Sequence, residues 1–308
     1  MNRITSGVLA GLMLASGLVG CTSAQSADPG WTSSATSEAV DLATRSGGWP
    51  KTEEELQNAA NRLDERCLRE AGFAVPTAPA VRLPAPEDEK AAIALGQRSN
   101  LGYGIATPAH ESTASAVETY VQTLSHPEQI RYRAAQFGSG APRTTIVLIP
   151  PAKVQVADGG CVATGRRSLA GDLRTWARLD YIPDQLDSRL SAQAMKVPRY
   201  KAALASWRAC LKARSFDFPS PEAAQTALRK EYARIGPSRR FKRREIAVAV
   251  ADGECAQKAH LPTVLLAARR SLVEHLPSSE LSSLRSLGTK RHTALARARK
   301  TLGMDKSG

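Results

Sequence analysis

Residues 67–76 read CLREAGFAVP, and residues 210–219 read CLKARSFDFP. Both follow the pattern C-L-[R/K]-x3-F-x2-P, so the chain repeats a stretch that begins with cysteine. A second cysteine follows each copy at a distance, because residues 157–161 read ADGGC and residues 251–255 read ADGEC. This repetition predicts one helical domain that is fastened in two places.

Apolar residues before the first copy recur with the period of an α-helix. Leu56, Ala60, Leu63 and Cys67 fall at i, i+4, i+7 and i+11, which places them on one helix face. We expect this helix to start with a capping box at residues 52–55, which read TEEE. Helical periods also surround the other repeated cysteines, so the predicted fold class is mainly α.

One stretch departs from the helical period. Residues 144–149 are β-branched and apolar, residues 150–153 contain two prolines, and residues 154–156 alternate between apolar and polar. This pattern predicts a small β-hairpin over about 144–157. The sequence predicts no other strands. The proline-rich residues 75–86 are expected to form a loop or an extended segment.

The amino terminus carries the most specific motif of the chain. Arg3 precedes an apolar stretch over residues 4–19, which is typical of a secretion signal. Residues 18–21 read LVGC and resemble the lipobox of bacterial lipoproteins. That resemblance implies cleavage before Cys21 and lipidation of its thiol, and two or more acyl chains anchor a protein stably. We therefore expect a lipid-anchored protein on the outer face of the cell membrane.

These features predict the organisation of the chain. Residues 1–20 are the lipoprotein signal peptide, and residues 21–48 are the lipidated cysteine and a flexible tether rich in Ser, Thr, Ala and Gly. Residues 49–276 form the disulfide-linked helical domain. Residues 277–303 form a basic helix that either lies on the membrane or, as we prefer, packs on the domain against the preceding helix. Residues 304–308 form a disordered tail.

The four cysteines after Cys21 predict disulfides, because exported chains with an even set of cysteines are usually oxidised. Four cysteines allow three pairings. The repeated pattern favours Cys67 with Cys161 and Cys210 with Cys255, so that each pair stays within its own copy. A redox-active role is the alternative, but no two cysteines have C-x-x-C spacing, so we prefer structural disulfides.

The net charge of +13 is concentrated in the last third of the chain. Residues 199–308 hold 23 Lys and Arg against 9 Asp and Glu. The densest basic cluster, a possible anion-binding site, consists of Arg239, Arg240, Lys242, Arg243 and Arg244. Such a cluster indicates an anionic neighbour, such as lipid headgroups or a cell-wall polymer, or it is a solvated helix start. Nucleic acid is not expected as a partner outside the cell.

Motifs of known catalytic chemistry do not occur in this sequence. The five histidines lack the spacing of metal ligands, and neither H-E-x-x-H nor C-x2-C is present. The G-x-S-x-G and G-x-x-x-x-G-K-[S/T] motifs are also missing. We therefore predict no catalytic residue, metal or cofactor. The alternative is a hydrolase of the cell envelope whose site is assembled from distant residues.

The order of several short motifs is similar to that of a group of secreted or lipid-anchored actinobacterial proteins of unassigned function. The resembling stretches are the lipobox, the two cysteine copies, residues 103–105, 160–161, 169–173 with Trp176, and 248–252 with Cys255. The resemblance implies no catalytic residues, because none are assigned in that group. We expect a non-catalytic binding or assembly component of the cell envelope, whose partner is an anionic lipid, a wall polymer or another envelope protein.

Overall fold

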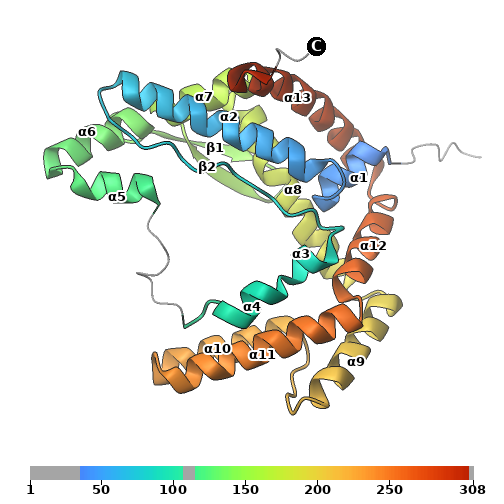
Figure 1. Ribbon diagram of the computed structural model, residues 1–308. Coiled ribbons are helices and arrows are strands. Elements are labelled where there is room, and N and C mark those ends of the chain that lie inside the picture. The colour runs from blue at the N-terminus through green and yellow to red at the C-terminus, as the bar shows by residue number, and fades with distance from the viewer. Residues whose placement is uncertain (1–34, 107–114, 305–308) are drawn as a thin grey trace, which may run out of the picture. The chain divides into compact units, whose positions relative to one another are not determined.

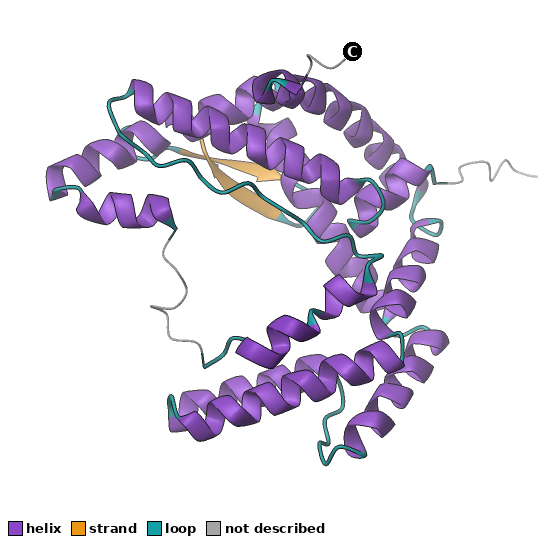
Figure 2. Ribbon diagram, viewed as in Figure 1, coloured by secondary structure: helices purple, strands orange, loops and turns teal. Residues whose placement is uncertain are grey.

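The computed structural model describes residues 35–106 and 115–304. These residues are mainly helical with one two-stranded hairpin, which confirms the predicted fold class (Figures 1 and 2). The predicted signal peptide, Cys21 and residues 305–308 lie outside the described residues. The elements are α1 (Ser37–Thr44), α2 (Trp49–Glu70), α3 (Glu89–Ile93), α4 (Leu95–Leu101), α5 (Ala116–Thr123), α6 (His126–Phe137), β1 (Arg143–Val147), β2 (Lys153–Ala157), α7 (Gly160–Ala170), α8 (Leu173–Ala194), α9 (Pro198–Lys212), α10 (Pro221–Ile235), α11 (Arg239–Lys258), α12 (Leu261–Val273) and α13 (Ser278–Leu302).

The predicted hairpin is present as the antiparallel pair β1 and β2. Its register runs from Arg143 opposite Ala157 to Val147 opposite Lys153. Ile146 is buried on the inner face, where it packs with residues of α7 and α8. Alternating apolar residues suit this position, because one face of the ribbon meets helices and the other meets solvent.

Helix α1 overturns part of the predicted flexible tether over residues 21–48. Ala39, Leu42 and Ala43 share one side of α1 and are almost completely buried. Thr36 caps the helix by accepting a hydrogen bond from the Ala39 amide at 3.2 Å. The Ser- and Ala-rich composition conceals this helix, because three small or aliphatic residues are enough to bury one short face. The tether prediction is therefore wrong for this part of the chain.

Helix α2 begins before the predicted capping box. Gly48 is the N-cap, and Pro50 lies in the first turn, where the missing proline N–H leaves no hydrogen bond unmade. The Thr52 hydroxyl donates a hydrogen bond to the Trp49 carbonyl at 2.9 Å and does not accept one from a helix amide. The predicted capping box is therefore wrong, although the helical face that it introduces is present.

Helix α13 lies along α2, α1 and α7. The larger hydrophobic core, called the first core below, is formed mainly by residues of α1, α2, α8 and α13. The apolar stripe of α13, which includes Leu281, Leu284 and Ala298, is buried in it. Arg291 is only 3% exposed and donates to Glu53 of α2 at 2.8 Å. The expected hairpin with the preceding helix is wrong, because α12 packs instead on α8 and α9.

A second core lies between α9, α11 and α12. It contains Trp207 and Leu211 from α9, Cys255 from α11 and Leu261 from α12. Helix α12 also packs on α1 and α8 of the first core. This helix therefore joins the two cores, and Figure 1 shows it between α1 and α9.

Both predicted disulfides are present. Cys67–Cys161 joins α2 to α7, Cys210–Cys255 joins α9 to α11, and the Cα–Cα distance is 5.6 Å in each. Their sequence separations are 94 and 45 residues, for which loop-closure entropy gives about 4–5 kcal/mol of stabilisation each. The pairing within each copy of the repeat is confirmed.

The repeated stretch forms the same helix terminus twice. The Phe73 amide donates to the Leu68 carbonyl at 3.0 Å, and the Phe216 amide donates to the Leu211 carbonyl at 3.1 Å. The residue before each Phe has a left-handed backbone conformation. Together these features are a Schellman terminus, in which the residue after the left-handed position packs back on the last turn. The pattern C-L-[R/K]-x3-F therefore encodes a helix end that is joined to a disulfide.

Candidate anion-binding groove

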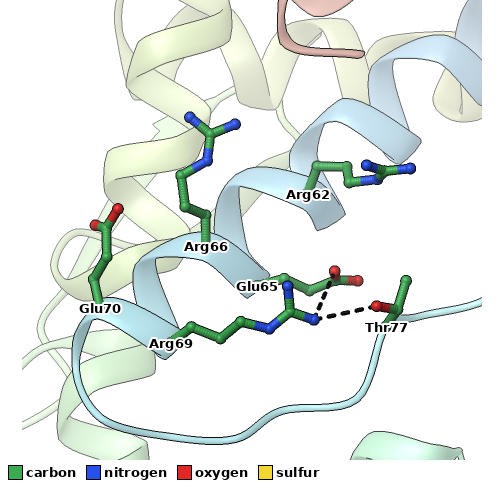
Figure 3. A pocket seen from close by; sticks show the side chains of 6 residues that line it. All are labelled: Arg62, Glu65, Arg66, Arg69, Glu70 and Thr77. Carbon is green, nitrogen blue, oxygen red and sulfur yellow. Dashed lines mark hydrogen bonds and ion pairs between the residues drawn. The ribbon is translucent and has the colours of Figure 1, made fainter. Parts of the chain in front are cut away.

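A groove lined by three arginines lies beside the second half of α2 (Figure 3). Arg62, Arg66 and Arg69 occupy positions i, i+4 and i+7 of the helix, so neighbours in this row have Cβ atoms about 5–6 Å apart. Two carboxylates and Thr77 complete the lining, and the groove has a volume of about 570 Å³. The groove is open to solvent, and the arginine side chains are exposed.

The wall opposite α2 is the extended segment over residues 75–86. Its four prolines have no N–H group and favour extended backbone. Three of the remaining amides bind side chains of α2: those of Leu83, Val81 and Ala78 donate to Glu54, Asn58 and Glu65 at 2.7, 2.8 and 2.7 Å. The segment runs antiparallel to α2. One turn of a helix rises about 5.4 Å and two extended residues span about 6–7 Å, so successive contacts stay roughly in register. The prediction of a loop or extended segment here is confirmed.

Arg69 is held in place by this segment. Its guanidinium donates to the Thr77 hydroxyl at 3.2 Å and to a backbone carbonyl, and it lies 3.5 Å from the carboxylate of Glu65. Figure 3 shows Arg62 and Arg66 nearby without such interactions, and neither has a hydrogen-bond or ion-pair partner among the described residues. Two guanidinium groups are therefore available to an external anion.

The groove continues past Arg62 toward the carboxyl end of α13. This part is lined by Asn58 and Asn61 of α2 and by Leu302 and Met304. Because Arg62 lines both parts, the two depressions adjoin. The combined surface is elongated and has a basic end and a more apolar end, which suits an extended ligand.

The predicted basic cluster lies at the start of α11. Some of its members have partners within the fold and others do not. Lys242 donates to the Leu101 carbonyl at 2.8 Å, and Arg244 pairs with Glu231 of α10 at 3.1 Å. The exposed members without a hydrogen-bond or ion-pair partner among the described residues are Arg239, Arg240 and Arg243. None of the cluster lines the groove beside α2, so the two basic surfaces are separate.

Two buried carboxylates of α11 hold a distant loop, and the sequence did not indicate this role. Asp252 accepts hydrogen bonds from Arg98, Tyr103 and Trp207 at 2.5, 2.8 and 2.9 Å. Glu245 accepts from two backbone amides just after Tyr103, at 2.7 and 3.0 Å. Burial, together with Asp252, raises the pKa of Tyr103, so its hydroxyl stays a donor. These groups are fully hydrogen-bonded, which is typical of a structural network.

The histidines in the part of the chain that the structure describes are exposed at the surface. That part holds no group of three or more His, Cys, Asp or Glu side chains suited to a metal ion. His260 pairs with Glu89 at 3.0 Å and His292 with Glu38 at 2.9 Å, both at the surface. Over the same residues, no helix combines the length and apolar character needed to cross a membrane.

No known protein family, curated protein or solved structure matches this chain. The function is therefore inferred from its own surface. The groove beside α2 combines two properties of an anion site. Arg62 and Arg66 offer guanidinium groups that no described residue pairs with, and Arg69 is already oriented by its neighbours.

Proposed function

We propose that the protein is a lipid-anchored, non-catalytic component of the cell envelope that binds an anionic wall polymer in the groove beside α2. The observation that carries the proposal is the pair Arg62 and Arg66, which are exposed side by side without partners among the described residues. Guanidinium groups bind phosphate and carboxylate oxygens through paired N–H donors. Arg69, which is held by Thr77 and paired with Glu65, adds N–H donors at a fixed position.

The shape and spacing of the groove favour a polymer over a small anion. Three arginines separated by about one helical turn can contact successive charges of one chain. The more apolar end near Leu302 and Met304 would contact the uncharged carbon units between the phosphates of such a polymer. The exposed arginines at the start of α11 would provide a second, less specific attraction to the same anionic surroundings.

The proposed location is the outer face of the cell membrane. Its support is the resemblance of residues 18–21 to a lipobox and the two disulfides, since disulfides persist in oxidising compartments. In this proposal the lipid on Cys21 holds the protein close to the wall. Metabolic labelling with palmitate tests the anchor, which is refuted if Cys21→Ala leaves both the label and membrane fractionation unchanged.

The groove is tested by a double substitution, R62Q/R66Q. We expect its affinity for poly(glycerol phosphate) to fall about tenfold or more at low salt, because each basic contact to an anionic surface contributes about 1 kcal/mol. Binding should also weaken as salt is added, because exposed charges are screened. Affinity is measured by microscale thermophoresis with labelled protein.

The matched control is R199Q/R208Q on α9, which removes the same charge from exposed residues without described partners. Its affinity should stay within about twofold of the unaltered protein. Equal losses in both variants would show that only net charge matters and would contradict the groove. If only R239Q/R240Q lost affinity for the polymer, the site would instead be at the start of α11. If the protein bound anionic vesicles as tightly as the polymer, lipid headgroups would be favoured as the ligand.

A further inference from the structure

A second depression lies between the end of the hairpin, α8 and α13. Its volume is about 560 Å³, within the range of small-molecule sites. The apolar floor is formed by Leu148 after β1, Leu186 of α8, and Leu284 and Leu287 of α13. Serine hydroxyls of α13 form much of the rim. The depression therefore offers both an apolar and a hydrogen-bonding surface.

The hairpin turn is fixed beside this depression by Gln185 of α8. The Gln185 side chain accepts a hydrogen bond from the Ile149 amide at 3.2 Å and donates one to the Ile149 carbonyl at 2.9 Å. Because Ile149 lines the depression, these bonds hold one of its walls against α8. A wall already in place reduces the entropy that binding would otherwise lose.

Arg178 lines the depression and lacks a partner. Its Nε atom is buried without a hydrogen bond, and the described residues provide it with no ion pair. A buried donor without an acceptor destabilises the fold, and the effect is larger for a charged group. The other N–H groups of Arg178 are not buried and also have no partner among the described residues, so an anion bound in the depression would accept from them.

The remaining charges of the depression do not satisfy Arg178. Glu280 also lines it, but the Glu280 carboxylate is held by two N–H groups of Arg189, one of them at 3.0 Å. Lys290 lines it as well and is exposed at the rim. The depression therefore keeps an excess of positive charge beside an apolar floor.

We propose that this depression binds a single-chain amphiphile with an anionic head group, of the fatty carboxylate class. The head group would lie on Arg178 and Lys290, with serine hydroxyls as further donors, and the hydrocarbon chain would lie on the leucine floor. The site goes beyond the proposed function, because its ligand is small and its residues come from the hairpin turn, α8 and α13. The groove beside α2 shares none of them.

Calorimetric titration with decanoate tests the site on the full mature chain carrying Cys21→Ser, purified without detergent. We expect 1:1 binding at concentrations below about 1 mM, a loss of about tenfold or more in R178Q, and no binding of decylamine. The matched control is R174Q, one turn earlier on α8, where Arg174 is exposed and does not line the depression. Its affinity should stay within about twofold of the unaltered chain.

A second substitution, Ser283→Trp, places a large side chain at the rim and should abolish decanoate binding while the melting temperature stays near its original value. Any of three results would overturn the proposal: no decanoate binding, equal losses in R178Q and R174Q, or equal affinity for decylamine. Undiminished binding by a folded Ser283→Trp variant would do the same. If that variant fails to fold, the comparison of R178Q with R174Q still decides the matter.

Discussion

The half-buried Asp180 and the buried Asp252 have carboxyl groups in opposite situations. Asp252 is surrounded by three side-chain donors, whereas Asp180 accepts one hydrogen bond, from Gln57 at 3.1 Å. Burial, together with the nearby charge of Glu53, raises the pKa of Asp180 to about 6. Asp252 therefore has a donor for each carboxylate oxygen, whereas burial disfavours the charged form of Asp180 at neutral pH.

Asp180 should therefore make stability depend on pH. Its folded pKa of about 6 lies above its ordinary value of 3.8, so the folded chain binds the proton more tightly than the unfolded chain. The contribution of this group to the free energy of unfolding is highest below pH 3.8 and falls as the pH rises to about 6. The total loss is on the order of 3 kcal/mol.

The substitution D180N should remove this loss. We expect it to raise the free energy of unfolding of the chain, and this gain should be about 1–3 kcal/mol larger at pH 7.5 than at pH 4.5. Urea unfolding at both pH values measures it. The control is D184N one turn later, since Asp184 is 67% exposed and its surface ion pair contributes no more than about 1 kcal/mol. An equal effect of D180N at both pH values would refute the assignment.

Gly253 shows why a residue that weakens a helix is placed inside α11. A Cβ atom at this position would lie 2.7 Å from Leu95, 3.0 Å from Arg98 and 3.1 Å from Ile93. The glycine lets α3 and α4 approach α11 closely enough for Arg98 to reach Asp252. The helix propensity lost here is about 1 kcal/mol relative to Ala, and the adjacent packing and hydrogen bonds offset it.

At the scale of elements, the repeated helix terminus uses a different residue in each copy. The left-handed position is Gly72 in the first copy, with φ +91°, and Ser215 in the second, with φ +65°. Glycine adopts this conformation without the strain that a Cβ atom causes. The second copy therefore carries a strain that the first avoids.

Exchanging these two residue types should have opposite effects. S215G should raise the free energy of unfolding by about 0.5–1 kcal/mol, and G72A should lower it by about 1 kcal/mol. A Cβ atom at Gly72 would meet nothing within 4 Å, so the second effect measures backbone strain alone. Thermal unfolding of both variants checks this, and a stabilising G72A would contradict the shared terminus.

At the scale of the described molecule, α1 belongs to the first core together with α2, α8 and α13. Helix α1 and the loop after it are also attached to α12, because Arg270 donates to Asp41 of α1 at 2.9 Å and also bonds to Ser46 in the loop. These contacts join the start of the described chain to helices near its end. The folded domain therefore includes residues that composition had assigned to the tether.

A chain that begins at residue 35 should therefore be more stable than one that begins at residue 49. We expect the shorter chain to melt at least about 10 °C lower, because burying Leu42 alone is worth about 2–5 kcal/mol and each 1 kcal/mol shifts the midpoint by about 2–4 °C. Circular dichroism on both chains measures the midpoints. Equal melting midpoints of the two chains would contradict the role of α1 in the core and would support a tether that extends to residue 48.

Local pattern was sufficient for the helical class, the hairpin and the disulfide pairing. Helical and strand periods, turn-forming prolines and a duplicated cysteine stretch are short-range signals that depend on a few neighbouring residues. They located most helices, but they missed α1 and the start of α2, where small residues and Pro50 form a helix that composition alone does not indicate.

The surfaces that carry the proposals depend on three-dimensional packing. Whether an arginine has a partner is decided by how the chain packs around it. Thr77 holds Arg69, Arg62 has no partner among the described residues, and Arg178 meets an apolar floor built from three separate segments. The basic run of α11 was visible as charge, but its division between structural and exposed members was not. A charge is set by residue type, whereas its partners are set by which distant segments the fold brings together.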